Sequence, residues 1–260
     1  MGPGLNSSIC SSTSGAADGA IGRIGETGDN SSISQTCRMT SDEQACHGDI
    51  LQERIYGDDA SAEVEVNEAN SVVARTALLL AHLDGLYPDE NWGQFLQDGA
   101  PIWSKVALSG ASQGGKTATY LSRDLEVGRA VLLNAMGSAF RGSGDTPVIV
   151  GPWSTLPRAT PAERTYGIWH AGEAANEYAP VLLAYHGVDV LGGTVDVEDT
   201  ALPFDCTHML RTTGTPAENN PDAIAGCDAH KSVGADACLA LDAQGLPQLS
   251  AAHIYMMTAR

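Results

Sequence analysis

The sequence predicts an α/β fold in which helices cover both faces of a mostly parallel sheet, and two observations lead to it. Short apolar runs that favour strands alternate along the chain with segments of helical periodicity, the order typical of parallel sheets. The length of 260 residues suffices for one sizeable core but not for two domains of ordinary size. We therefore expect a single domain over residues 33–260.

The first part of the chain contains a leader and one long helix. Residues 1–32 are rich in Gly and Ser and lack a sustained apolar period, which favours a flexible leader ahead of the domain. A helix is expected from Glu68 to Leu86, where apolar residues recur on one face. Asn67 or Asn70 is suited to cap its N-terminus, and the pair Tyr87–Pro88 ends it.

Strands and helices alternate over the rest of the chain. Strands are expected at 103–110, 128–134, 164–170 and 193–197, and helices at 117–125, 174–185 and 249–258. The first of these strands runs directly into a glycine-rich turn. The series contains no internal repeat.

The charge balance is strongly acidic. Asp and Glu outnumber Lys and Arg 32 to 14, for a formal net charge of -18. Such a surface repels phosphate backbones and anionic lipid headgroups, which argues against a general nucleic-acid-binding role. No run approaches the roughly 20 apolar residues of a membrane span. A basic segment followed by an apolar core, the mark of a signal peptide, is not visible either.

Six cysteines lie in polar, loop-like sequence, at positions 10, 37, 46, 206, 227 and 238. Exposed thiols are a liability, so disulfides formed in an oxidising compartment explain these residues better than buried thiols do. The expected pairs are Cys37 with Cys46, and Cys227 with either Cys238 or Cys206. We therefore expect a secreted or periplasmic protein whose export signal lies outside this chain.

The glycine-rich turn after the first of these strands fits two motifs. As Gly-x-Ser-x-Gly, from Gly110 to Gly114, it is a nucleophile elbow, in which Ser112 occupies a strained strand-to-helix turn that glycines allow. As Gly-x-x-x-x-Gly-Lys-Thr, from Gly110 to Thr117, it is a phosphate-binding loop whose lysine and threonine reach a nucleotide phosphate and magnesium. Both motifs need a strand before the turn and a helix after it.

The rest of the chain favours the elbow. A nucleotide hydrolase needs a second strand that ends in an aspartate for magnesium, whereas the strand that follows the turn ends in Asn134. The one substitute, the segment 195–199, has acids that interrupt its apolar run. A serine hydrolase needs an acid and then a histidine downstream of its serine, and the chain offers both. The phosphate-binding interpretation of Gly110–Thr117 remains an alternative.

Several segments, in their order and spacing, resemble a little-characterised secreted bacterial branch of the α/β-hydrolase superfamily. They are Cys37…Cys46-His-Gly and the segments 54–59, 87–96, 103–115, 160–173, 206–210 and 228–236. The resemblance covers residues 34–258 and includes the nucleophile segment around Ser112. It implies an α/β-hydrolase fold, a serine hydrolase activity of the carboxylesterase or lipase kind, and no cofactor.

The resemblance also implies roles for individual residues. Ser112 aligns with the nucleophile, Glu173 falls just beyond a strand where the family has its acid, and His230 falls in the loop that carries the base. In this mechanism His230 takes the proton of Ser112 as the serine attacks an ester carbonyl, and Glu173 orients the imidazole. The backbone N–H of Gln113 donates to the oxyanion.

Other residues compete for two of these roles. His208 and His253 are alternative bases, and Glu177 and Asp189 are alternative acids. His230 is preferred because its segment is polar, loop-like and close to two cysteines, whereas His253 lies on an apolar helix, where a histidine usually packs. No Cys-x-x-Cys or His-Glu-x-x-His pattern occurs, so no metal site is expected.

One part of such an active site is not found in the sequence. Relatives carry an early strand and a glycine-containing turn that supplies a second oxyanion donor, but no convincing apolar strand precedes Ser34. A hydrolase-like protein that only binds ligands is therefore a further alternative. For the enzyme, we expect a monomer that acts on a small-molecule or polymeric ester.

Overall fold

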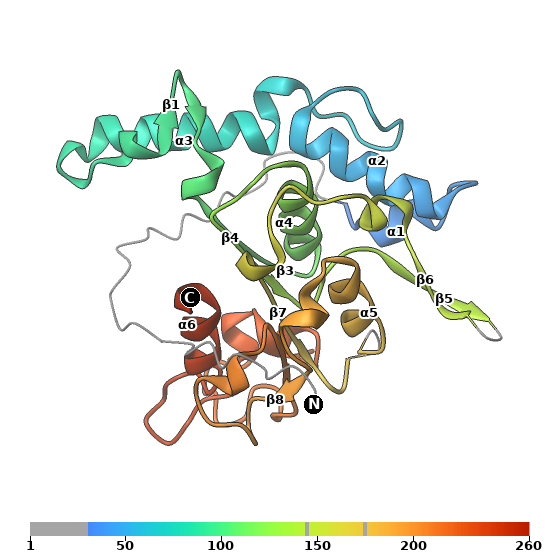
Figure 1. The fold of residues 1–260 in the computed structure, drawn as a ribbon, viewed down its shortest axis with the longest axis vertical. Coiled ribbons are helices and arrows are strands. Elements are labelled where there is room, and N and C mark those ends of the chain that lie inside the picture. Colours follow the sequence, from blue (N-terminus) through green and yellow to red (C-terminus); the bar gives the residue numbers. More distant parts are fainter. Residues whose placement is uncertain (1–30, 144–145, 174–175, 260) are drawn as a thin grey trace, which may run out of the picture.

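The centre of the protein is a sheet of five parallel strands in the order β3-β4-β7-β9-β8 (Figure 1). The computed structural model describes residues 31–143, 146–173 and 176–259, so nearly all of the expected leader at 1–32 lies outside the described residues. The strands are β3 (Ala107–Ala111), β4 (Arg129–Leu133), β7 (Thr165–His170), β8 (Val195–Asp196) and β9 (Met209–Thr212). An all-parallel sheet with helices packed on it confirms the α/β class.

Helices and two small hairpins surround this sheet. The helices are α1 (Ile33–Cys37), α2 (Glu43–Tyr56), α3 (Val72–Leu86), α4 (Gln113–Asp124), α5 (Tyr178–Tyr185) and α6 (Ser250–Thr258). One hairpin pairs β1 (Leu96–Gln97) with β2 (Ala100–Pro101), and the other pairs β5 (Ala139–Ser143) with β6 (Thr146–Val150). The second hairpin lies between β4 and β7 in the chain.

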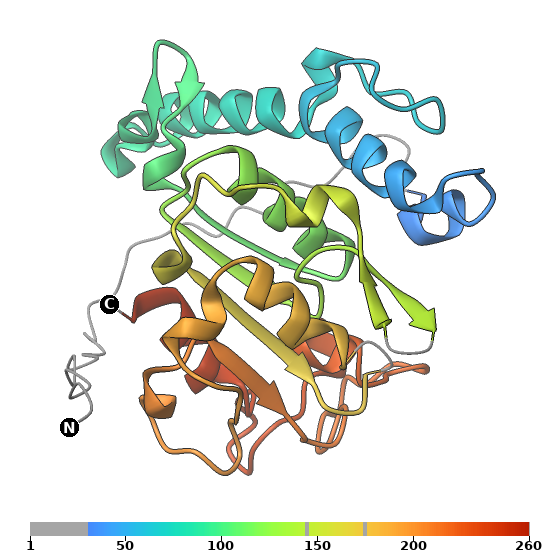
Figure 2. The ribbon, with the colours of Figure 1, turned by 45° about the vertical axis from the view of Figure 1, so that its right-hand side comes forward.

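Alternation along the strands divides the core into two layers. In β4, Ala130 and Leu132 face helices α4 and α5, while Val131 faces α6 on the opposite side of the sheet. A third cluster joins α1 and α2 to the outer side of α4, so this helix is covered on two sides (Figure 2). Every residue of β7 is buried, as a strand with both faces covered requires.

The first turn of α3 differs from the sequence-based prediction. The helix begins at Val72, and Ser71 caps it by accepting a hydrogen bond from the N–H of Ala74 at 3.1 Å. Asn67 instead caps a separate 3₁₀ turn, Glu68–Asn70. The predicted start at Glu68 is therefore wrong, because two successive caps divide the segment that the apolar pattern joined.

Two disulfides tie loops to the core. Cys37–Cys46 joins the end of α1 to α2, as predicted. Cys227 pairs with Cys238, which decides between the two expected partners, and Cys206 is a free thiol within the described part of the chain. The first bridge fixes the turn between two helices, and the second closes the loop segment that carries His230.

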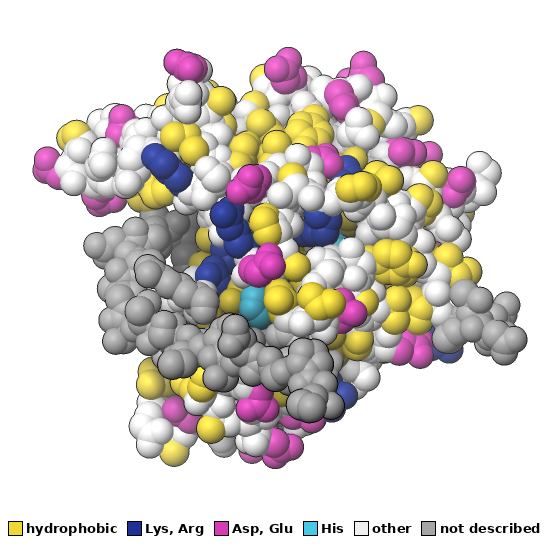
Figure 3. Space-filling model, viewed as in Figure 1, with side chains coloured by type: hydrophobic (Ala, Val, Ile, Leu, Met, Phe, Trp, Pro, Cys, Tyr) yellow, Lys and Arg dark blue, Asp and Glu magenta, His cyan; other side chains and the backbone are white. Residues whose placement is uncertain are grey.

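The surface is acidic, as the composition requires. On the face shown in Figure 3, Asp and Glu side chains are spread widely, and Lys and Arg side chains are fewer. Within the described residues, no helix combines the length and the apolar character that crossing a bilayer demands.

Candidate active site

The turn between β3 and α4 consists of a single residue, Ser112. Its backbone has a φ of 55° and a ψ of -121°, a combination that costs about 1–3 kcal/mol for an L-residue. Two backbone hydrogen bonds hold it: the Ser112 N–H donates to Leu133 O at 3.0 Å, and the Lys116 N–H donates to Ser112 O at 3.1 Å. Strain that ordered neighbours impose in this way is typical of functional sites.

Close packing around the turn explains two of its glycines. A Cβ atom on Gly110 would lie 2.3 Å from the carbonyl carbon and oxygen of Gly114. One on Gly115 would lie 2.6 Å from the carbonyl oxygen of Ala135, whereas Gly114 has open space at that position. Strand and helix therefore approach each other so closely that glycine is required at 110, as expected, and also at 115, which the elbow motif does not single out. The expected need for glycine at 114 is wrong, because a side chain there would point into open space.

The connection between β3 and α4 is too short to form the loop that a phosphate-binding motif needs. α4 begins at Gln113, earlier than the pattern predicted, so only Ser112 lies between strand and helix. In a phosphate-binding loop, the residues after the first glycine wrap around the phosphates before the helix begins. The segment 195–199 is the one substitute for a magnesium-binding aspartate. Its Asp196 carboxylate is already held by Arg211 in a bidentate ion pair at 2.6 and 2.8 Å.

His230 and Glu173 form a hydrogen-bonded pair. The Nδ1 atom of His230 lies 2.9 Å from Oε2 of Glu173, and the side chains are 37% and 14% exposed. Because a carboxylate only accepts hydrogen bonds, Nδ1 carries the proton, which leaves the lone pair of the neutral ring on Nε2. The hydrogen bond to Glu173 raises the pKa of His230 above its ordinary value, although burial opposes the shift. This is the arrangement of a general base held by an orienting acid.

These residues meet at the carboxyl edge of the sheet. Ser112 follows β3, Glu173 follows β7, and His230 lies in the loop after β9. Asn134, directly after β4, connects them: its side-chain amide donates to the carbonyl oxygen of His230, and its Oδ1 accepts the N–H of His170 at 3.1 Å. The residue before Asn134 accepts the hydrogen bond from the elbow, so the end of β4 contacts both the serine and the histidine loop.

The loop that carries His230 also packs directly on the elbow strand. A Cβ atom on Gly234 would lie 2.7 Å from the Cβ of Ala111, the residue before Ser112. Within the described residues, no hydrogen bond joins the Ser112 hydroxyl to His230. Catalytic hydrogen bonds are often long without substrate and tighten in the complex, so this open pair is compatible with the roles of nucleophile and base.

Gln113 occupies the first position of α4, where the helix N-terminus favours negative charge near its N–H groups. Its side-chain Oε1 accepts the N–H of Ile33 at 3.1 Å, so the start of α1 lies against the elbow. The sequence does not predict that α1 packs here, because the contact joins residues that are 80 positions apart in the chain.

The competing candidates lie elsewhere. His208 directly precedes β9, and its Nδ1 lies 3.0 Å from the carbonyl oxygen of Thr165 at the amino end of β7. His253 is partly buried in α6, and burial lowers its pKa. Glu177 is 50% exposed and pairs with an exposed arginine at 3.9 Å, and Asp189 is exposed. Among the candidate acids and bases, the described residues bring together only the pair at 173 and 230.

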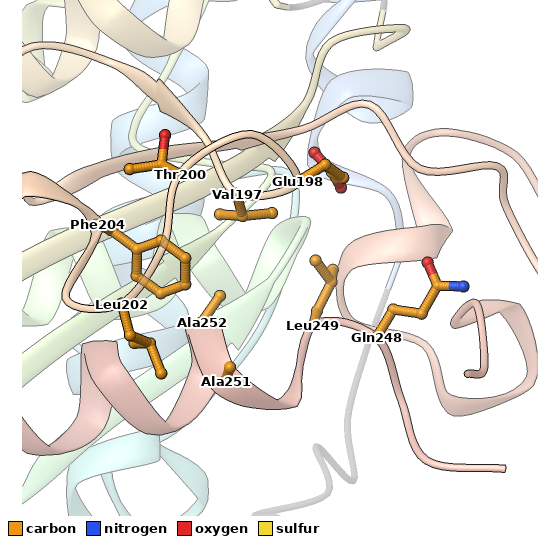
Figure 4. A pocket seen from close by; sticks show the side chains of 9 residues that line it. All are labelled: Val197, Glu198, Thr200, Leu202, Phe204, Gln248, Leu249, Ala251 and Ala252. Carbon is orange, nitrogen blue, oxygen red and sulfur yellow. The ribbon is translucent and has the colours of Figure 1, made fainter. Parts of the chain in front are cut away.

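A shallow pocket on another part of the molecule is separate from this site. It is lined by residues that follow β8 and by the start of α6 (Figure 4). Phe204, Leu249 and Ala252 make its wall mostly apolar. Its lining residues lie after β8, at the opposite edge of the sheet from β3, and around the start of α6, and none of them is Ser112, Glu173 or His230.

No protein-family model, curated protein or solved structure matches the chain significantly. The α/β class and the disulfides therefore rest on the structure itself. Any activity has to be argued from the chemistry of the site, because a fold class alone does not specify function.

Removal of the Cys227–Cys238 disulfide, by Cys227→Ser together with Cys238→Ser, should destabilise the protein. The bridge joins residues with a sequence separation of 11 and encloses His230, and closing a loop of this size stabilises by about 3 kcal/mol. Denaturant titration of the oxidised protein measures the change. Cys206→Ser, which removes no bridge, is the control, and an unchanged free energy of unfolding in the double variant would contradict the expectation.

Proposed function

We propose that the protein is a secreted serine hydrolase of the α/β-hydrolase type that cleaves carboxylic esters through an acyl-enzyme. The proposal rests on the His230–Glu173 hydrogen bond, located beside the strained turn that presents Ser112. A nucleophile, a base and an orienting acid are the groups that this chemistry requires. Their order along the chain, serine, acid, histidine, is the order of α/β-hydrolases.

The arrangement of the strands supports the α/β-hydrolase type. The strands before the serine, the acid and the histidine are β3, β7 and β9, which lie in this order in the sheet with β4 between the first two. Ligands of open parallel sheets bind beyond the carboxyl ends of the strands, where these residues lie. The two disulfides support export to an oxidising compartment.

The first half of the reaction forms the acyl-enzyme. Nε2 of His230 removes the hydroxyl proton of Ser112 while the serine oxygen attacks the ester carbonyl carbon. Glu173 stabilises the imidazolium that results. The backbone N–H of Gln113 donates to the oxyanion, and the imidazolium then gives its proton to the departing alcohol as the carbon–oxygen bond breaks.

Water completes the cycle. His230 takes a proton from a water molecule whose oxygen attacks the acyl carbon, and Ser112 regains its proton as the carboxylic acid leaves. These residues need no cofactor for the reaction. The substrate is a small-molecule or polymeric ester, and we expect the enzyme to act as a monomer.

Covalent labelling tests the proposal. A fluorophosphonate should form one adduct, which mass spectrometry locates on Ser112, and Ser112→Ala should abolish it. Ser109→Ala, an exposed serine of the same strand, is the matched control and should label like the wild type. The wild type should also hydrolyse short p-nitrophenyl esters. Resistance to both reagents would refute the enzyme and leave a hydrolase-like protein that only binds ligands.

The pH dependence gives a second test. His230 accepts a proton only when neutral, and the hydrogen bond to Glu173 raises the pKa of His230 above its ordinary value of 6.5. The value of kcat/KM should therefore rise with pH through a midpoint above 6.5 and fall on acidification. Glu173→Gln removes the charge that favours the imidazolium, so its midpoint should move to lower pH. Equal midpoints in pH–rate profiles of the two proteins would contradict this assignment of the acid.

A further inference from the structure

We infer that the site also binds an anionic group of the substrate at Lys116, so that the preferred substrates are esters whose acyl part carries a second carboxylate. The inference rests on the proposed function, because it assigns a substrate class to the same site. Lys116 lies in the first turn of α4, and its N–H donates to Ser112 O at 3.1 Å. The backbone of Lys116 therefore lies one helical turn, a rise of about 5.4 Å, from that of the nucleophile.

The ammonium group of Lys116 has few partners. Its Nζ lies 3.4 Å from the Oγ of Ser34, and no carboxylate of the described residues lies within ion-pair distance of it. The charge of Glu43 acts on Lys116 from farther away, and burial lowers the pKa of Lys116 to about 8. A partly buried ammonium is unfavourable unless an anion pairs with it. Lys116 has no such anion among the described residues, so an anionic ligand would supply the missing partner.

The charge of Lys116 acts on two histidines, His230 and His47. This charge opposes the rise in the pKa of His230 that the hydrogen bond to Glu173 causes. In α2, burial is the main cause that lowers the pKa of His47 to about 4, and the charge of Lys116 adds to it. His47 is 3% exposed, its Nδ1 lies 3.0 Å from the Oγ of Ser138, and its Nε2 has no partner among the described residues. The ammonium of Lys116 and a buried imidazole nitrogen of His47 thus have unused hydrogen-bonding capacity.

The position of Lys116 indicates the size of the anion-bearing group. The side chain is partly accessible, and a lysine pairs with carboxylates as a compact point charge. In a chain of net charge -18, a cation so close to the nucleophile selects for negative charge at this one point. Because the two backbones are one helical turn apart, a monoester of a four-carbon dicarboxylic acid, with its short acyl chain, is the substrate chosen to probe this site.

Monoethyl succinate and ethyl butyrate test the inference, because they are similar in length and differ in one carboxylate. The wild type should cleave monoethyl succinate with a kcat/KM about 10- to 100-fold higher, the range of a charge-assisted hydrogen bond. Lys116→Met should lower this ratio to near one, chiefly through KM, and Lys116→Arg should restore part of it. Lys105→Met, which removes an exposed lysine, should leave the ratio unchanged.

Direct binding separates this inference from the proposed function. Calorimetric titration of the Ser112→Ala variant with succinate should show binding that added Lys116→Met abolishes and added Lys105→Met does not. Labelling at Ser112 with equal cleavage of both esters and no succinate binding would overturn the anion site and leave the esterase standing. Succinate binding that depends on Lys116, in a wild type that no fluorophosphonate labels, would support the anion site and refute the esterase.

Discussion

Replacing His230 by alanine should lower kcat for ester hydrolysis by about 10⁴- to 10⁶-fold. The effect is large because the imidazole acts twice, first as the base for Ser112 and then as the acid for the departing alcohol. The side chain is 37% exposed, so its removal should leave the fold intact. Initial rates with a p-nitrophenyl ester measure the loss, and His82→Ala, an exposed histidine of α3, is the control.

Glu173, the partner of His230, should contribute almost as much to kcat as His230 does. Glu173→Gln keeps the size of the side chain but removes the negative charge, and its amide NH2 can donate to Nδ1 and so favour the wrong tautomer of the ring. We expect a loss of about 10⁴-fold in kcat. Because the two residues act as a unit, the double variant should be little slower than His230→Ala alone. A His230→Ala enzyme that retains rates close to the wild type would refute this base. If His208→Ala or His253→Ala were then inactive instead, the role would pass to that histidine.

Much of the sheet can be predicted from local sequence. β4 and β7 each have an apolar centre, Ala130–Leu133 and Tyr166–Trp169, because both of their faces are buried, and a pattern of that kind depends little on distant parts of the chain. The elbow is predictable for a similar reason. Its glycines and its serine are dictated by contacts between neighbours in sequence, such as the approach of Gly110 to Gly114.

Elements whose surroundings come from distant segments are not predictable in this way. α2 was not predicted because its buried face includes His47, Glu53 and Arg54, which interrupt any apolar period. Glu53 is satisfied by the N–H groups of Ala60 and Val66, two loop residues that a pattern search cannot pair with it. β9 was missed because a strand of four residues is too short to show a period.

The candidate site also combines residues that local sequence predicts with residues whose contacts come from distant segments. Ser112 is evident from its motif, whereas Glu173 and His230 are assigned through the resemblance, and their contact spans 57 residues. The neighbours of Lys116 were not predictable at all, because Ser34 is 82 residues away in the chain. The early start of α4 was missed since two glycines in its first turn have low helix propensity, and packing overrides that preference.

Gly110→Ala should destabilise the protein by about 3 kcal/mol or more and abolish labelling at Ser112. The added Cβ would lie 2.3 Å from two backbone atoms of Gly114, so no side-chain rotation relieves the contact. Strand and helix must move apart instead. The backbone conformation of Ser112 then loses the neighbours that enforce it, and the serine no longer faces the histidine loop.

Gly114→Ala is the matched control for this prediction, because it adds the same methyl group within the same turn. Its Cβ position is open, and alanine is favoured over glycine within a helix by up to about 1 kcal/mol. Denaturant titration should therefore separate the two variants by several kcal/mol, with Gly114→Ala at or above the wild type. Equal stabilities would mean that the elbow tolerates a side chain at 110. The strain at Ser112 would then have to be maintained by the hydrogen bonds to Leu133 and Lys116 alone.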